Sequence, residues 1–358
     1  MAHWRRAGAA RIARIARLRR PAADGFGRVS LDGMSMSGHD LEAGTAENYR
    51  AFAGEARGRS PQYEELAMAV AGNPQVLEFL NALRPAKRQP NLLFAAACYL
   101  LGEPADLAAL GKLIRDRGDE LTATMRSRRT QTNEPARCAT LLPALALLPQ
   151  PLALIEVGAS AGLTLLADRY SYDYSGHRVT GTDPLAPVLA CEPHGPVPLP
   201  ARVPEVAWRA GLDLNPLDVT ADDDVRWLTC LLWPGEHDRR ERLGAAIETA
   251  RRDPPKVYRG DLLTDTAALA GQAPPGTTLV IFHSAVLAYV GVPQRAQFAT
   301  LVRELGAVWL SNEAPGVVPD IATEHRGGGK FVLIRDGTQA LACTDGHGAW
   351  LKWQLGRA

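Results

Sequence analysis

The stretch Leu152-Ala-Leu-Ile-Glu-Val-Gly-Ala-Ser-Ala-Gly162-Leu-Thr-Leu-Leu-Ala-Asp168 joins an apolar run to a turn of small residues. The run 152–157 is apolar except for one acid, which is typical of a strand buried on both faces of a parallel sheet. From Leu163 onward, leucine and alanine recur at helical spacing. Residues 158–162 are therefore predicted as a tight strand-to-helix turn whose backbone can approach a ligand. This order of elements predicts an α/β fold with a nucleotide-type site.

Two phosphate-binding motifs do not fit the turn. A Walker loop needs a lysine and then Ser or Thr after its last glycine, whereas Leu163-Thr164 follows Gly162 here. The dinucleotide fingerprint fails because Ser160 stands where its second glycine belongs. An α/β turn that binds no ligand stays open as an alternative.

The segment Glu156-Val-Gly-Ala-Ser-Ala-Gly162 resembles the first motif of the Rossmann-like methyltransferases, with two of the usual three glycines kept. The resemblance implies a Rossmann-like, mostly parallel sheet and S-adenosylmethionine (SAM) as the cofactor. It also implies which residues of the motif would surround SAM: Glu156, Gly158, Ala159, Ser160 and Gly162.

Length and composition are those of an ordinary globular protein. The chain has 358 residues, which is long enough for two domains or for one domain with a large cap. It is 46% hydrophobic and 22% charged, as is usual for globular proteins. The net charge of +1 gives no reason to expect a nucleic-acid partner. No apolar run approaches the ~18 residues that span a bilayer, so no membrane association is expected. The five cysteines are an odd number without C-x-x-C spacing, which predicts reduced thiols, a cytoplasmic location and no metal site.

Residues 1–45 are predicted to be a disordered basic extension. Seven arginines fall within the first twenty residues, and Gly/Ser-rich sequence follows. A membrane-surface or nucleic-acid arm, and a start codon placed too early, are the alternatives.

Residues 46–130 are predicted to form a helical cap domain. Apolar residues recur at helical spacing, Ser60-Pro61 and Asn73-Pro74 are typical helix starts, and the apolar run 90–101 ends at Gly102. The rest of the chain, 131–358, is predicted as the methyltransferase-type domain, with an insertion near 171–204 where proline and glycine are frequent.

The stretch 126–134 is polar, yet it lies directly before an apolar helix that leads into the first strand. A helix of about 15 residues spans ~22 Å, which would return the start of that helix to the edge of the sheet where the glycine turn lies. Ligands of open α/β sheets bind at that edge. Arg129, Gln131, Asn133 and Glu134 are therefore candidates for binding a small-molecule substrate, and helix capping with a solvated loop is the alternative.

A second resemblance rests on several motifs together. Arg129-Thr-Gln-Thr-Asn-Glu134, then Arg137-Cys138 and then 156–163, are similar to a bacterial family of unknown function with a helical N-terminal half and a methyltransferase-like C-terminal half. The similarity covers roughly residues 50–355. Thr164 stands where that family usually has Asn.

Acids follow two further predicted strands. Asp213 ends the strand 206–214, where a fixed carboxylate can accept hydrogen bonds from both hydroxyls of a ribose. Asp183 is its rival, closer to the turn in sequence but not clearly attached to a strand. Asp261 follows the strand 256–259, and the methyltransferase resemblance implies that it holds the adenine amino group; a helix N-cap is the alternative.

The strand 278–282 ends at His283-Ser284, and Tyr289 follows closely. A histidine at this edge can act as a general base, although a lone strand-end histidine is as often structural. Together with Glu134 and Tyr289, it forms the predicted catalytic set. A fifth strand, 308–310, precedes an antiparallel meander over 330–355 that finishes the sheet.

Three functions are compatible with these residues. The first is a SAM-dependent methyltransferase acting on a small molecule, because methyl transfer needs little beyond in-line positioning. The second is a metabolite-binding or regulatory protein on the same fold. The third is a hydrolase or transferase that uses His283 and Glu134 as acid and base.

Overall fold

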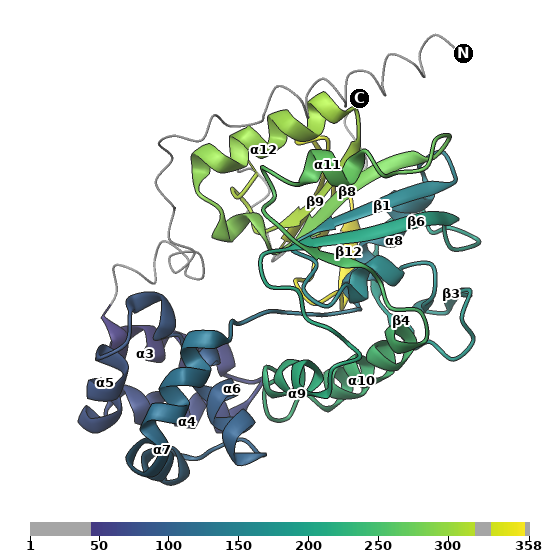
Figure 1. Ribbon diagram of the computed structural model, residues 1–358. Coiled ribbons are helices and arrows are strands. Elements are labelled where there is room, and N and C mark those ends of the chain that lie inside the picture. Colours follow the sequence, from purple (N-terminus) through teal and green to yellow (C-terminus); the bar gives the residue numbers. More distant parts are fainter. Residues whose placement is uncertain (1–43, 319–330, 355–358) are drawn as a thin grey trace, which may run out of the picture. The chain divides into compact units, whose positions relative to one another are not determined.

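The computed structural model describes residues 44–318 and 331–354, so the predicted basic extension lies outside the described residues except at its end. The described chain forms two compact units (Figure 1). The helical unit comprises residues 44–132 and Thr220–Gly244, and the sheet unit comprises Asn133–Val219 with residues 245–318 and 331–354. This division differs from the predicted boundaries, 46–130 and 131–358, because Thr220–Gly244 belongs with the helices.

The helical unit is built from two separate stretches of chain. Asn73 caps the start of its third helix, where the Asn73 side chain accepts hydrogen bonds from the backbone N–H groups of Gln75 and Val76. Gly102, in a left-handed conformation with φ of 88°, ends the apolar helix as predicted. Its elements are α3 (Thr45–Ala56), α4 (Pro61–Ala71), α5 (Pro74–Asn81), η2 (Pro85–Lys87), α6 (Pro90–Leu101), α7 (Leu107–Ser127), α9 (Asp222–Cys230) and the first part of α10 (His237–Arg252).

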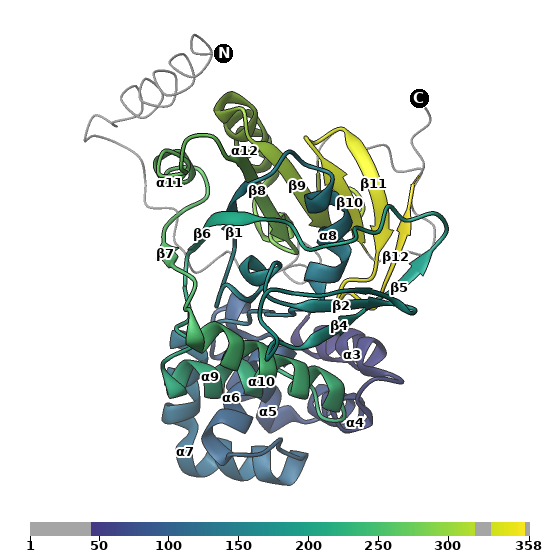
Figure 2. The same ribbon diagram turned by 90° about the vertical axis from the view of Figure 1, so that its right-hand side faces the viewer.

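Two tryptophans join the second stretch to the first. The ring of Trp233 lies 5.0 Å from that of Phe52, and the ring of Trp227 lies 5.9 Å from that of Tyr99, on α6. Figure 2 shows α9, from the second stretch, beside α6. Both tryptophans are buried. The two rings therefore form part of the core of the helical unit.

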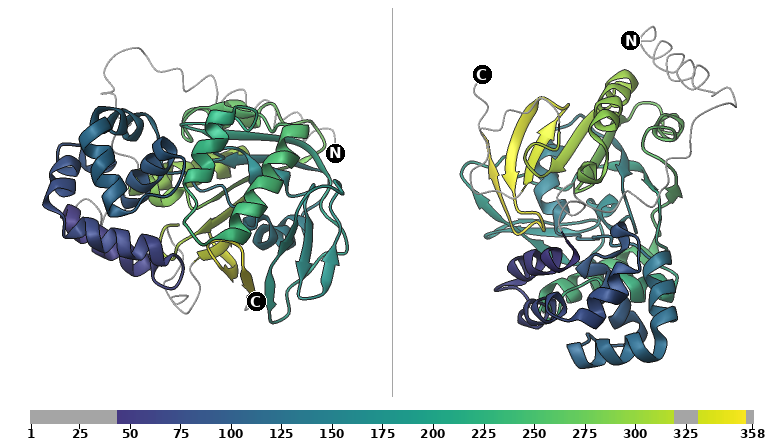
Figure 3. Two further views of the ribbon diagram at one scale, coloured as in Figure 1. Left: turned by 90° about the horizontal axis from the view of Figure 1, so that it is seen from below. Right: turned by 90° about the vertical axis from the view of Figure 1, so that its left-hand side faces the viewer.

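The sheet unit contains a mixed, mostly parallel sheet of nine strands in the order β5-β12-β11-β10-β9-β8-β1-β6-β7. Strands β7, β6, β1, β8 and β9 run parallel to one another, as expected for an α/β fold. Strands β9 to β12 run antiparallel, which confirms the predicted C-terminal meander (Figure 3). The strands are β1 (Leu152–Val157), β5 (Glu192–His194), β6 (Val206–Asp213), β7 (Val257–Arg259), β8 (Thr278–Ser284), β9 (Val308–Glu313), β10 (Phe331–Arg335), β11 (Gln339–Thr344) and β12 (Trp350–Trp353).

Helices cover both faces of this sheet (Figure 1). All six residues of β1 are buried, as predicted for a central strand. Side chains alternate between faces along a strand, so Ile155 and Val157 point to one face and Glu156 to the other. The first face packs on α11 (Thr266–Ala270) and α12 (Val292–Leu305), and α8 (Arg137–Ala146) lies on the Glu156 face.

The helix predicted after the glycine turn is absent. Only a single 3-10 turn forms there, η3 (Leu163–Leu166). Side chains from elsewhere donate to carbonyls that a continuing helix would use: Tyr170 Oη to Leu163 O at 2.8 Å and Arg209 Nη1 to Leu165 O at 2.9 Å. The helical spacing in the sequence covers only a few residues after Gly162. So short a pattern does not form a helix when other side chains occupy the carbonyls that the helix would need.

The predicted insertion forms a small sheet. Strands β2 (Ser171–Tyr174) and β3 (His177–Val179) make a hairpin, and β4 (Val188–Ala190) pairs with β2 in parallel. Strand β5 then leaves this sheet and pairs in parallel with β12 at the edge of the large one. Pro193 lies in this edge strand, where its missing N–H group costs no ladder hydrogen bond.

Candidate functional site

The glycine turn lies at the carboxyl end of β1, between β6 and β8. Gly158 and Gly162 have left-handed φ values of 72° and 71°, and Ser160, which is not a glycine, has a φ of 51°. Each of the five backbone N–H groups of residues 158–162 donates a hydrogen bond within the protein. The acceptors are Leu212 O for residues 158 and 159, Asp213 Oδ2 for 160, Asn133 Oδ1 for 161 and Ala159 O for 162. A turn with its N–H groups used in this way presents no cradle for a phosphate.

Asp213 is joined directly to this turn. Its Oδ2 accepts from the N–H of Ser160 at 2.8 Å, and its Oδ1 accepts from the N–H of Asn215 at 2.7 Å. A carboxylate has about four lone-pair sites, so two bonds leave capacity for a ligand hydroxyl. The rival acid Asp183 instead forms an ion pair with Arg252 at 2.6 Å. The structure therefore places Asp213, and not Asp183, at the turn.

Glu156 is a buried acid immediately before the turn. The hydroxyl of Thr164 donates to its Oε1, and its Oε2 is buried with no hydrogen-bond partner. Burial raises the pKa of Glu156 to about 8, against the lowering effects of the Thr164 hydrogen bond and the charge of Arg137. The carboxyl is therefore mostly protonated at neutral pH. Thr164, which replaces the Asn usual in the similar family, holds this acid.

The polar stretch 129–134 crosses the boundary between the two units. Arg129 and Gln131 belong to the helical unit, where the Arg129 carbonyl accepts from the indole N–H of Trp227 at 2.9 Å. Asn133 and Glu134 belong to the sheet unit. Asn133 contacts the turn, since its Nδ2 donates to Ser160 Oγ at 2.5 Å. Glu134 is buried, and its Oε1 accepts from the N–H of Ala136 at 3.1 Å.

His283 has protein partners at both ring nitrogens. Its Nδ1 lies 2.7 Å from Glu313 Oε1, and its Nε2 accepts from the indole N–H of Trp309 at 2.9 Å. An indole nitrogen can only donate, so Nε2 is the unprotonated nitrogen and Nδ1 carries the proton. The ring is fully buried. This geometry leaves no ring nitrogen available as a general base.

The other two predicted residues follow two further strands of the sheet. Tyr289 is half exposed in η4 (Leu287–Tyr289), just after β8. Asp261 follows β7, and its Oδ1 accepts from the N–H groups of Leu263 and Thr264, so it stabilises the start of a loop. The N-cap alternative does not occur, because α11 begins at Thr266 and Asp265 is its N-cap residue.

Sequence reasoning missed two polar groups at the same edge. Glu313 ends β9 and accepts three hydrogen bonds at Oε1, from His283 and from the N–H groups of Val286 and Leu287. Arg137 is buried on the Glu156 face and donates to Ser284 O and Gly346 O. Asn312-Glu313 could be recognised in the sequence as the polar end of the predicted strand 308–310, but nothing in the sequence pairs Glu313 with His283, so it was not among the candidate site residues.

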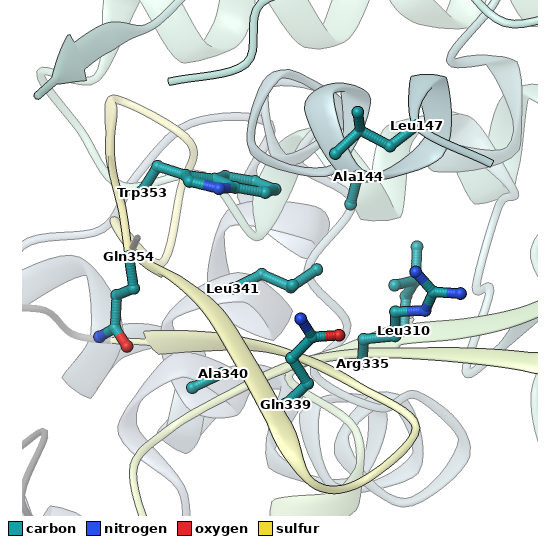
Figure 4. Close-up of a pocket in the computed structure, with 9 residues that line it drawn as sticks. All are labelled: Ala144, Leu147, Leu310, Arg335, Gln339, Ala340, Leu341, Trp353 and Gln354. Atoms are coloured by element: carbon teal, nitrogen blue, oxygen red, sulfur yellow. The ribbon is translucent and has the colours of Figure 1, made fainter. Parts of the chain in front are cut away.

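A pocket of about 230 Å³ lies elsewhere in the sheet unit (Figure 4). Leu147, Leu341 and Trp353 form its apolar walls, and Arg335 and two glutamines lie at its rim. Because Arg335 and Gln339 flank the β10–β11 hairpin, the pocket is at the opposite end of β9 from Glu313. It is separate from the turn.

The described residues were also compared with the requirements of a metal site and of a membrane-spanning helix. Among residues 44–318 and 331–354, no three His, Cys, Asp or Glu side chains cluster in a way that could hold a metal ion. Over the same ranges, no helix has both the length and the apolar character needed to cross a membrane.

Comparison with known families gives one match. The family described as "Uncharacterized protein conserved in bacteria (DUF2332)" matches residues 46–353, which covers both units. No curated protein matches the chain.

Proposed function

From the premise that this chain belongs to the DUF2332 family of bacterial proteins, we propose that it is a SAM-dependent methyltransferase with a Rossmann-like sheet and a small-molecule substrate. The observation that carries the proposal is the hydrogen bond between Asp213 and the glycine turn at the ends of adjacent parallel strands. A carboxylate fixed there can bind the two hydroxyls of a ribose.

The strand order supports the position of the ligand. From β1 the chain proceeds to β6 and β7 on one side and then to β8 and β9 on the other. The direction reverses between β1 and β8, and ligands of open α/β sheets bind at the carboxyl ends of strands at such a point. Ser160 and Ala285, both with left-handed φ, follow these two strands. Unfavourable backbone conformations of this kind gather at ligand sites.

The hydrogen bonding of the turn favours SAM over phosphate-containing cofactors. The five N–H groups of residues 158–162 already have acceptors, and SAM carries no phosphate that would need them. Methyl transfer depends mainly on positioning, because the sulfonium is already activated. The proposal therefore needs no general base at His283, and it leaves Glu134 and Tyr289 as the candidates on the substrate side.

A metabolite-binding protein without transferase activity is the second candidate. A Cβ built on Gly158 would lie 2.4 Å from the side chain of Val286, so this side chain fills the space beside the first glycine. Such close packing favours a ligand held near Asp213 over one that reaches Gly158. Bound SAM that is never converted to its demethylated product by a metabolite extract would favour this second function.

Calorimetric titration with SAM and its demethylated product tests the first proposal. Asp213→Asn is the informative variant, and Asp183→Asn is its control, because the Asp183 carboxylate pairs with Arg252 away from the turn. We expect binding to the unmodified protein and to Asp183→Asn, and an affinity at least about tenfold lower in Asp213→Asn, since hydrogen bonds to charged groups exceed 1 kcal/mol. A folded protein that gives no heat, or equal affinity in both variants, would refute the proposal.

A further inference from the structure

The two sequence motifs singled out above are joined through one side chain. Asn133, from the polar stretch, donates from Nδ2 to Ser160 Oγ at 2.5 Å and accepts at Oδ1 from the N–H of Ala161 at 3.1 Å. Its amide group therefore bridges two successive residues of the glycine turn. The predicted alternative, in which Asn133 caps α8, does not occur, since α8 begins at Arg137 with no side-chain cap.

Ser160 adopts a conformation that its Cβ disfavours. Its φ is 51°, in the left-handed region where glycine is preferred. All three of its polar atoms are held: the N–H by Asp213, the carbonyl by the N–H of Leu217 at 3.1 Å, and the hydroxyl by Asn133. A serine at the second glycine position of such a turn needs partners of this kind to keep its shape.

We propose that Asn133 is a positioning residue, which holds Ser160 in its left-handed conformation and so keeps the turn and Asp213 in the geometry that binds the ligand. The ligand itself rests on the proposed function above, but the role of Asn133 in the turn does not. Asn133 acts through Ser160, in contrast to the direct substrate contact expected from the sequence. The serine in the motif and the asparagine in the polar stretch thus form one structural unit.

The conformational preference of glycine gives a direct test. Ser160→Gly removes the hydroxyl but adopts the left-handed conformation without a side-chain anchor, whereas Ser160→Ala removes the same hydroxyl and keeps the disfavoured Cβ. If Asn133 works by holding Ser160, then Asn133→Ala and Ser160→Ala loosen the turn. The double variant Asn133→Ala/Ser160→Gly then restores it.

Hydrogen exchange of the ligand-free protein measures this directly, over a peptide containing residues 158–162. We expect exchange about tenfold faster in Asn133→Ala and in Ser160→Ala, which corresponds to loss of one hydrogen bond. Exchange in Ser160→Gly is expected to stay within about threefold of the unmodified protein. In the double variant the same is expected for the amides of residues 158–160 and 162, whereas the amide of Ala161 still lacks its Asn133 acceptor and is left out of the comparison. Gln150→Ala is the control, because it removes side-chain hydrogen bonds to the backbone before β1, and it should leave the turn unchanged.

Affinity for SAM provides the second measurement. We expect affinity to fall in Asn133→Ala and to recover in the double variant. Loss of affinity with unchanged exchange and no rescue would show a direct ligand contact and overturn the proposal, as would unchanged exchange in Asn133→Ala. If no variant binds SAM, the exchange data still decide the role of Asn133, and only the proposed function fails.

Discussion

Glu156 shows how burial alone changes the state of a single acid. It lies in an interior strand, with a hydroxyl at one carboxyl oxygen and no partner at the other. Its pKa rises from 4.5 to about 8, mainly because burial disfavours the charged form. Because the folded pKa exceeds the unfolded one, Glu156 favours folding most below pH 4.5, and this contribution is lost as the pH rises through about 8.

Glu156→Gln should therefore remove a pH dependence. Glutamine matches the neutral acid in shape and keeps an acceptor for the Thr164 hydroxyl. We expect the unfolding free energy of the unmodified protein to fall between pH 5 and pH 8 relative to the variant, by on the order of 3 to 5 kcal/mol. Urea denaturation across this range measures it, with the exposed Glu205→Gln as the control for charge. Parallel pH profiles for the protein and Glu156→Gln would contradict the burial argument.

Glu313 is the acceptor for three donors, and this gives a second prediction at the same scale. Glu313→Ala leaves His283 Nδ1 and the N–H groups of Val286 and Leu287 without their acceptor. We expect this variant to lose more than about 3 kcal/mol of stability, and Glu313→Gln, which keeps one acceptor oxygen, to lose about 1 to 2 kcal/mol.

Chemical denaturation of these variants at pH 7 gives the comparison. The exposed Glu192→Ala serves as the control on the edge strand β5. If Glu313→Ala unfolded at the same denaturant concentration as Glu192→Ala, Glu313 would have no role in stabilising the end of β8.

At the scale of elements, the strands could be predicted from sequence more fully than the helices. Runs such as 152–157 and 278–282 are mostly apolar on both faces, and such runs are typical of central strands. The helix after Gly162 could not be excluded, because its carbonyls are taken by Tyr170 and Arg209 from distant or later segments. Likewise, the sequence indicated that Asp213 and Glu156 lie at the turn, but not which groups donate hydrogen bonds to their carboxyl oxygens.

The turn and the neighbouring strand β6 make a close contact that is open to mutation. A Cβ built on Gly211 would lie 2.7 Å from Cβ of Ala159 and 3.0 Å from a methyl of Val257. Gly211 has no left-handed φ, so alanine there is opposed by the clash alone. We expect Gly211→Ala to cost about 1 to 3 kcal/mol.

Ala159→Gly should relieve part of this cost. Alone it is expected to cost up to about 1 kcal/mol, through backbone entropy. Combined with Gly211→Ala, it should give a double variant more stable than the sum of the single changes predicts. Thermal denaturation of the four proteins completes the cycle, and simple additivity would contradict the contact.

At the scale of the whole molecule, the helical unit is discontinuous in sequence. Residues 44–132 contribute most of its helices, while Thr220–Gly244 contributes the two tryptophans of its core. Both tryptophans also donate hydrogen bonds to residues of the first stretch: Trp233 Nε1 to Asn91 Oδ1 at 2.8 Å, and Trp227 Nε1 to Arg129 O at 2.9 Å. Local patterns identify each helix, but nothing in residues 131–219 signals that the chain returns to an earlier unit.

A fragment of residues 44–132 is therefore expected to fold poorly alone and to gain helicity when a peptide of residues 220–244 is added. The fragment contains no tryptophan, so fluorescence reports only on Trp227 and Trp233 of the peptide. We expect a blue shift and increased circular dichroism at 222 nm on mixing. A peptide carrying Trp233→Ala should bind more weakly, since that ring packs on Phe52 and Tyr63. Full helicity of the isolated fragment would contradict this.

The pairing of β5 with β12 has a consequence for the nascent chain. Residues 192–194 emerge from the ribosome long before residues 350–353, and in the described sheet β5 is the edge strand that pairs with β12. During synthesis, β5 must therefore wait beside an unfinished sheet while the meander is made. Proline at position 193 limits what else can pair with it meanwhile. The missing N–H group of Pro193 therefore leaves β5 a poorer template for pairing with another chain before β12 is made.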